Sequence, residues 1–405
     1  VWVTQLSRFI AMSGVALVLS IGFIVLGIIS QLLKGDISLV EMDLYAYDLL
    51  SYNWGWLTFV LEIALVFFIA GVTANRYLTH VLSVGTLFGL LFAFELGLAE
   101  QGRFYYAGVP GLEEYSEISG YGIWTISAAW FFFMWAMLAT AFVLLGIYFW
   151  KRGTTQNWFN KLKFTSNQLS WGGKVAALCA LLLFFVMQSF VVLNTTEKGN
   201  FTLSTKEECT AAAYETDFGY LKDLPHPKYA AVDLTFDFYP SDRKASYTAN
   251  IDLVNTSSIP VDTLYFVTND QVDIHDVSVS GKPIPLSWEA EEHHQKAYAL
   301  RSSLLPGDTL SLFLKAVKDY QGFVQSSATP QPDLMFNGSF GHILEFLPTV
   351  GYKHENELDE NRERVSEGLP RLTSRMAEIG DEKALQEDAL APDALKLKGT
   401  ITVGT

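Results

Sequence analysis

The stretch GKVAALCALLLFFVMQSFVVL, residues 173–193, separates two unlike halves of this 405-residue chain. Its only charged residue is Lys174, close to its start. A helix needs about 20 apolar residues to cross a hydrocarbon core about 30 Å thick, so this run predicts a membrane span. No comparable run follows Leu193, and we therefore expect the rest of the chain to lie outside the bilayer.

Similar apolar runs precede this one, which predicts a multi-pass α-helical membrane domain over residues 1–193. Hydrophobic residues make up 50% of the chain and charged residues 18%, which agrees with a large membrane-embedded part. The predicted spans are residues 9–33, 55–74, 79–99, 122–150 and 173–193.

The charges between the spans predict which way the protein is oriented. The loop from Lys151 to Lys174 is basic and contains neither Asp nor Glu, whereas the loops on the opposite side are acidic. Lys and Arg near membrane ends stay in the cytoplasm, so residues 194–405 are expected to be extracytoplasmic. The net charge of −15 and the patchwise acidic exterior argue against nucleic acid as a partner, because nucleic acid demands clustered Lys and Arg.

After the last span, the periodicity of the apolar residues changes from helical to strand-like. Residues 194–228 are predicted to form a tether with a short helix, from about Lys206 to Leu221, whose start carries the capping-box pair Thr205 and Glu208. Residues 229–352 are predicted to form an all-β sandwich or saddle, since apolar and polar residues alternate there. The expected strands lie around 232–238, 247–253, 262–268, 273–280, 296–302 and 309–317.

The final part, residues 353–405, is predicted to be a charged strap followed by a strand that the end of the chain truncates. Residues 353–395 are rich in charge and are expected to be extended or loosely helical. Leu397 to Val403 then resumes an alternating pattern. Because the chain starts at Val1 and stops within this pattern, we expect it to be a piece of a longer polypeptide.

Two acidic residues inside the spans are the candidate site residues, Glu62 in the second span and Glu95 near the outer end of the third. A carboxylate in hydrocarbon is costly, so it normally faces protein or water and marks function. For Glu95 the alternative is that its side chain simply reaches the membrane interface.

The exported half carries one near match to a catalytic motif. Residues 354–358, HENEL, begin like the zinc-binding HExxH motif but have Leu358 where the second His is required. No phosphate-binding GxxxxGK[ST] sequence occurs either. We therefore predict no catalytic, cofactor-binding or metal-binding residue in this chain.

Short motifs in both halves together indicate a family. They are LSRFIA (6–11), NRYLTH (75–80), WKRGT (150–154), LVNTS (253–257), FNGS (336–339), FLPTVGY (346–352), EL (357–358), GLP (368–370) and RM (375–376). With these motifs the chain resembles bacterial fusion proteins that join an ABC-2-type transporter permease to a zinc aminopeptidase of the aminopeptidase N family.

The resemblance implies a location and partners. Residues 1–193 would be the last five spans of a permease half in the bacterial inner membrane, with the lipid bilayer and a cytoplasmic ABC ATPase subunit as partners. Residues 229–352 would be the peptidase's amino-terminal β domain, which docks against the downstream peptidase domain of the same parent chain. Zinc is expected in that downstream domain, where the family's HExxH motif would lie.

Two other functions remain open. The chain could be a non-enzymatic membrane anchor whose β domain is an extracytoplasmic binding module, and a gene that stops soon after Thr405 would favour this. It could also be a secondary transporter driven through Glu62, which would require pH-dependent uptake that Glu62→Gln abolishes.

Overall fold

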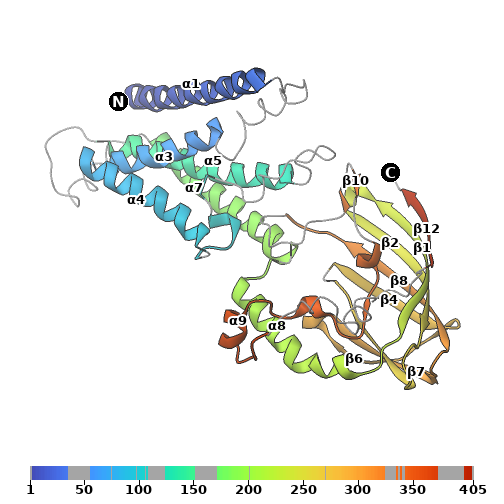
Figure 1. Ribbon diagram of the computed structural model, residues 1–405. Coiled ribbons are helices and arrows are strands. Elements are labelled where there is room, and N and C mark those ends of the chain that lie inside the picture. The colour runs from blue at the N-terminus through green and yellow to red at the C-terminus, as the bar shows by residue number, and fades with distance from the viewer. Residues whose placement is uncertain are drawn as a thin grey trace. The chain divides into compact units, whose positions relative to one another are not determined.

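The computed structural model divides the chain into two compact units, a helical unit (Val1–Phe201 with Gly322–Gln331) and a β unit (Thr202–Gln321 with Pro332–Thr405). Figure 1 shows the helices and strands of both units. The structure describes residues 2–34, 55–73, 75–96, 98–104, 106–107, 124–150, 171–199, 201–269, 271–323, 334–335, 338–339, 343–372 and 396–403. The basic loop 151–170 and most of the strap, 373–395, lie outside the described residues.

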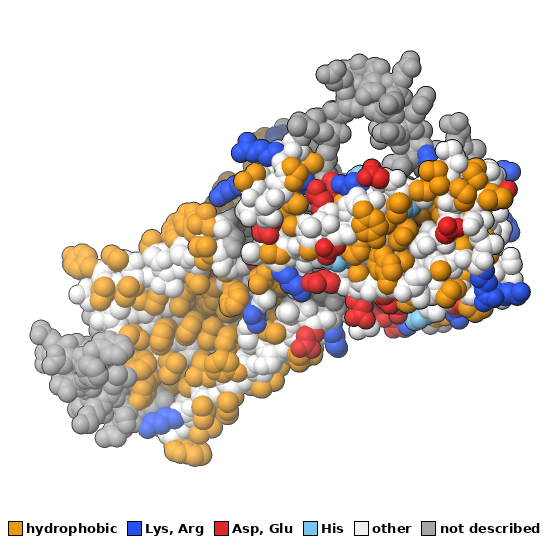
Figure 2. All heavy atoms as spheres, turned by 90° about the horizontal axis from the view of Figure 1, so that it is seen from below, with side chains coloured by type: hydrophobic (Ala, Val, Ile, Leu, Met, Phe, Trp, Pro, Cys, Tyr) orange, Lys and Arg blue, Asp and Glu red, His pale blue; other side chains and the backbone are white. Residues whose placement is uncertain are grey.

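The helical unit contains five long apolar helices, which confirms the predicted α-helical class of this half of the chain. Each of its long helices is apolar enough to cross a membrane, and Figure 2 shows hydrophobic side chains over much of its surface. The helices are α1 (Trp2–Lys34), α3 (Trp56–Thr73), α4 (Arg76–Glu95), α5 (Trp124–Phe149) and α7 (Trp171–Val192).

Helix α1 buries polar rather than apolar side chains. Gln5, Ser13 and Ser20 are its buried residues, and they recur about every two turns along one face. Its Val, Leu and Ile side chains are largely exposed. This inverted pattern suits a lipid-facing helix, because lipid solvates the apolar face while small and polar residues contact neighbouring helices.

Helices α3 and α5 form the close-packed centre of the unit. They cross where Gly71 meets Gly146, so closely that a Cβ atom on Gly71 would lie 2.5 Å from the carbonyl oxygen of Gly146. Nearby, the rings of Phe68 and Phe142 stack with their centroids 5.0 Å apart. Small residues at such a crossing allow the helix backbones to approach.

The β unit contains two main sheets, which confirms the predicted all-β fold. One has six strands in the order β12-β1-β2-β8-β4-β5, and the other has four in the order β11-β3-β7-β6. A two-stranded sheet pairs β9 (Leu334–Met335) with β10 (Gly338–Ser339). The main strands are β1 (Lys228–Tyr239), β2 (Lys244–Val254), β3 (Val261–Val267), β4 (Val272–Val279), β5 (Lys282–Pro283), β6 (Leu286–Ala290), β7 (Gln295–Leu304), β8 (Thr309–Asp319), β11 (Thr349–Val350) and β12 (Lys396–Val403).

Alternation along the strands places the core between the main sheets. In β1 the apolar residues Val232, Leu234 and Phe236 are buried, while the residues between them face outward. The strands predicted from this pattern are all present, although β5, β6 and β11 were missed because they are too short for alternation to stand out. The last predicted strand is β12, which pairs in parallel with β1.

The tether contains α8 (Ser204–Phe218), followed by a 3-10 turn at Gly219–Asp223. The predicted capping box is wrong. The N-cap residue is Leu203, whose side chain has no hydrogen-bonding group. Instead, the Thr202 hydroxyl donates to the carboxylate of Glu207.

Candidate functional site

The two predicted site residues lie in different helices of the helical unit. Glu62 lies in the second turn of α3, beside the buried Leu61. Its side chain is partly buried. Glu95 is the last residue of α4, and its side chain lies outside the described part.

A loop residue that the sequence analysis missed packs beside Glu62. Tyr106 lies between α4 and α5, and its hydroxyl donates a hydrogen bond of 2.7 Å to the carbonyl oxygen of Leu61. Its ring contacts the ring of Trp135 on α5 edge to face, with the centroids 5.1 Å apart. Tyr106 therefore packs against α3 and α5.

The hydroxyl of Tyr106 lies within the electrostatic influence of Glu62. Burial, and after it the charge of Glu62, raises the pKa of the Tyr106 hydroxyl, which therefore stays protonated and donates. Trp135 is buried, and its ring also lies 6.2 Å from that of Phe184 on α7. The aromatic run from Phe104 to Tyr106 in an otherwise acidic loop was the available sequence signal.

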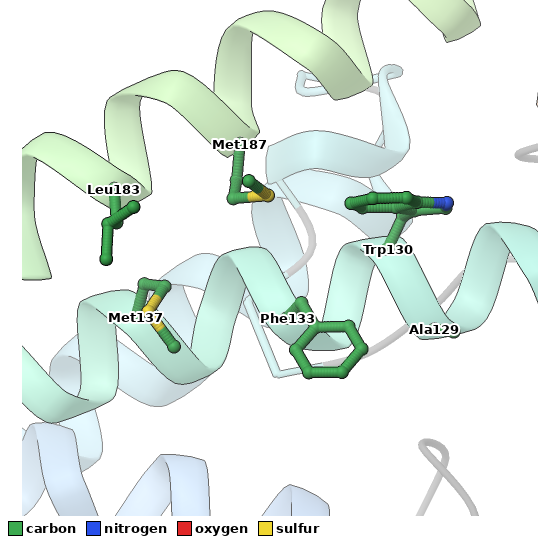
Figure 3. A pocket seen from close by; sticks show the side chains of 6 residues that line it. All are labelled: Ala129, Trp130, Phe133, Met137, Leu183 and Met187. Carbon is green, nitrogen blue, oxygen red and sulfur yellow. The ribbon is translucent and has the colours of Figure 1, made fainter.

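A second feature of the helical unit is an apolar pocket of about 330 Å³ between α5 and α7. Figure 3 shows the side chains around it, among them Met137 and Met187 from the two helices. Its lining is wholly apolar. Such a lining suits a hydrocarbon chain and offers no group for chemistry. The lining residues are Ala129, Trp130, Phe133, Met137, Leu183 and Met187.

The C-terminal end of α7 is held by residues that follow β8 in the chain. The helix continues as a π-helical turn, Leu193–Glu197. The backbone N–H of Phe323 donates to the carbonyl oxygen of Asn194 at 2.8 Å, and the Phe323 ring contacts that of Phe190 at 5.8 Å. Gly322 has a φ of +80°, and a Cβ there would collide with this turn.

In the β unit, the near match to HExxH forms an ion-pair network. His354 Nδ1 lies 2.9 Å from Glu357 Oε1, and Lys222 Nζ lies 2.9 Å from the same oxygen. Burial alone would raise the pKa of Glu357, but hydrogen bonds from Lys222 and His354 outweigh it and lower this pKa. Among the described residues, no three His, Cys, Asp or Glu side chains are grouped so that they could hold a metal.

Comparisons with known proteins give a distant structural likeness only. No protein-family model matches the chain, and no curated protein matches it. An M1 zinc metallopeptidase from Deinococcus radiodurans is similar over 24% of this chain and 21% of its own, with 14% identity and a TM-score of 0.21. A mutant M1 zinc metallopeptidase from the same organism covers 28% of this chain and 24% of its own, with 16% identity and a TM-score of 0.22.

Proposed function

We propose that this chain is the membrane-embedded, permease-like part of an ABC-2-type transporter fused to an aminopeptidase N-type zinc peptidase, together with the peptidase's non-catalytic β domain. The helical unit would anchor the protein in the bacterial inner membrane. The β unit would stand outside the cytoplasm and frame the substrate cleft of the downstream peptidase domain. A cytoplasmic ABC ATPase subunit is the expected partner on the other side.

The observation that carries this proposal is the direct connection of the two units. Helix α7 ends at Val192 and α8 begins at Ser204, so the β unit follows the last span almost immediately. The motifs that resemble the fusion family lie on both sides of this junction, among them WKRGT at 150–154 and FLPTVGY at 346–352. We assign no catalytic step to the described residues.

The proposal is tested on the polypeptide as it occurs in its own membranes. It is immunopurified with an antibody against residues 228–319 and analysed for mass, zinc content and hydrolysis of an aminoacyl p-nitroanilide. We expect a mass well above 45.2 kDa and about one zinc ion per polypeptide. We also expect hydrolysis that a chelator stops and added zinc restores.

A mock purification with pre-immune antibody controls for contaminating peptidases. A polypeptide close to 45.2 kDa, without zinc and without hydrolysis, would contradict the proposal. That result would favour the alternative, in which the β unit is a non-enzymatic binding module on a membrane anchor.

A further inference from the structure

His226 lies at the end of the tether, two residues before β1 begins at Lys228. Pro225 and Pro227 flank it, and a residue that precedes a proline is held in extended backbone. The imidazole ring lies against the backbone of Gly351, which follows β11. A Cβ atom added to Gly351 would collide with Cδ2 of His226, so the ring fits only because this residue has no side chain.

The segment around Gly351 connects the ring of His226 to the docking of α8. The N–H of Gly351 donates to the carbonyl oxygen of Tyr265 on β3 at 2.8 Å, and the Tyr265 ring meets the His226 ring edge to face at 6.0 Å. The next residue, Tyr352, places its ring 5.0 Å from that of Tyr214 on α8. The seat of the imidazole is therefore continuous with the contact between α8 and the four-stranded sheet.

The hydrogen bonds of His226 fix which ring nitrogen carries the proton. Nε2 lies 2.7 Å from the carbonyl oxygen of Leu221 in the 3-10 turn after α8. Because a carbonyl oxygen only accepts, Nε2 is protonated and donates, and Nδ1 carries the lone pair. Nδ1 is buried and has no hydrogen-bond partner in the described part of the chain. A second proton on Nδ1 would therefore bury both a charge and an unpaired N–H group, and each is costly.

The groups that contact the ring are a backbone carbonyl, a phenol ring and a glycine, which carry no charge near neutral pH. On the tether, Lys222 is paired with Glu357 at 2.9 Å, and Asp223 is exposed. After Gly351, the Nζ of Lys353 donates to Oδ1 of Asn269 at 2.8 Å. A second proton on the ring would gain no ion pair from the groups that the ring contacts.

The direction of the pH effect follows from this environment. Burial lowers the pKa of His226, and the hydrogen bond to the carbonyl of Leu221 opposes this effect only in part. The docked state therefore binds fewer protons than a state in which the ring is exposed to water. Docking is fully stable above the ordinary histidine value of about 6.5 and weakens as the pH falls below it.

We propose that His226 is a pH-sensitive latch, which holds α8 and its 3-10 turn on the four-stranded sheet when neutral and releases them when protonated. Both the Leu221 carbonyl and the Gly351 backbone lose their contact with the ring on release. The tether is the segment that joins the last span to β1, so acid loosens this connection. This inference does not depend on the proposed function.

Hydrogen–deuterium exchange of the full chain in detergent tests the latch, with rates corrected for the intrinsic effect of pH. The range from about pH 5 to pH 7.5 spans the titration of histidine and lies above that of ordinary carboxylates. We expect the opening constant of α8 to rise below about pH 6.5, by up to about tenfold per pH unit. In His226→Gln this constant should not depend on pH, because an amide can donate to Leu221 but does not titrate.

His293→Gln and His354→Gln are the matched controls, because both histidines also lie beside the contact made by α8. The ring of His293 is 5.4 Å from that of Phe218 on α8, and the ring of His354 is 5.1 Å from that of Tyr352. Both variants should keep the pH dependence of the wild type. A pH dependence that persists in His226→Gln, or that disappears in either control, would overturn the proposal.

A second measurement needs no variant and decides the matter if size-exclusion profiles show that His226→Gln fails to fold. Exchange of the histidine C2 hydrogen in the wild-type chain, followed by mass spectrometry, gives the pKa of His226 directly. We expect this pKa to lie below the ordinary value of about 6.5, and a pKa at or above that value would overturn the proposal. None of these results depends on zinc or on a peptidase domain.

Discussion

At the scale of single residues, Arg364 holds the segment after β11 against α8. Its guanidinium makes two hydrogen bonds to the carboxylate of Glu215, of 2.7 and 2.6 Å. It also donates to the carbonyl oxygens of Pro370 at 2.8 Å and Leu358 at 2.9 Å. Arg364 is only 1% exposed. Its buried positive charge is paired with the carboxylate of Glu215, and its guanidinium also donates to two backbone carbonyl oxygens.

We expect Arg364→Met to destabilise the docking of this segment by about 3–5 kcal/mol, because the carboxylate of Glu215 is left buried and unpaired. Hydrogen–deuterium exchange of the full chain in detergent measures this as lost protection of α9 (Asn361–Ser366). The double variant with Glu215→Leu should regain most of the protection. Arg362→Met, at an exposed position of the same helix, should change little, and equal effects of the two Arg variants would refute this role.

At the scale of secondary-structure elements, the contact between α3 and α5 depends on the absence of side chains at one point. Gly71 and Gly146 face each other there, and a Cβ on Gly146 would lie 2.8 Å from the ring of Phe67. The same two helices also stack the rings of Phe68 and Phe142 against each other.

Gly71→Ala should therefore separate the two helices and cost about 1–3 kcal/mol as an overpacked contact. The thermal unfolding midpoint of the chain in detergent should fall accordingly. Gly89→Ala is the matched control, since a Cβ at Gly89 in α4 meets no atom within 4 Å and alanine favours a helix over glycine. A midpoint that falls as far in Gly89→Ala as in Gly71→Ala would contradict this explanation.

At the scale of the whole molecule, the chain passes repeatedly between its two units. It leaves the helical unit after Phe201, returns at Gly322 and leaves again after Gln331. The first return is held by the backbone bond between Phe323 and Asn194.

The two natural cysteines test the expected orientation of the chain in the membrane. Cys209 is exposed on α8 in the β unit, whereas Cys179 lies within α7. A membrane-impermeant maleimide should label Cys209 in intact spheroplasts, because residues 194–405 are expected to be extracytoplasmic. Cys209→Ser should abolish the labelling and Cys179→Ser should not. Labelling that requires cell lysis would place the β unit in the cytosol and remove the basis of the peptidase proposal.

The sequence alone determined the kind of each major element. A span is recognised from its own length and hydropathy, and a strand from its own alternation, so both are local properties. Glu62 was predicted as a candidate site residue for the same reason, because a carboxylate is conspicuous in an apolar run. The N-cap residue of α8 was not predicted, because the side chain of Leu203 has no hydrogen-bonding group by which the sequence could identify it as a cap.

Only the tertiary structure decided which residues meet. Tyr106 and Trp135 resemble many other aromatic residues in the sequence, and their contact brings together residues that lie 29 positions apart in the chain. Arg364 belongs to a segment expected to be an extended or loosely helical strap, yet it pairs with Glu215, which lies 149 residues earlier. Such pairs depend on chain folding over long distances, whereas periodicity reports only on neighbours a few residues apart.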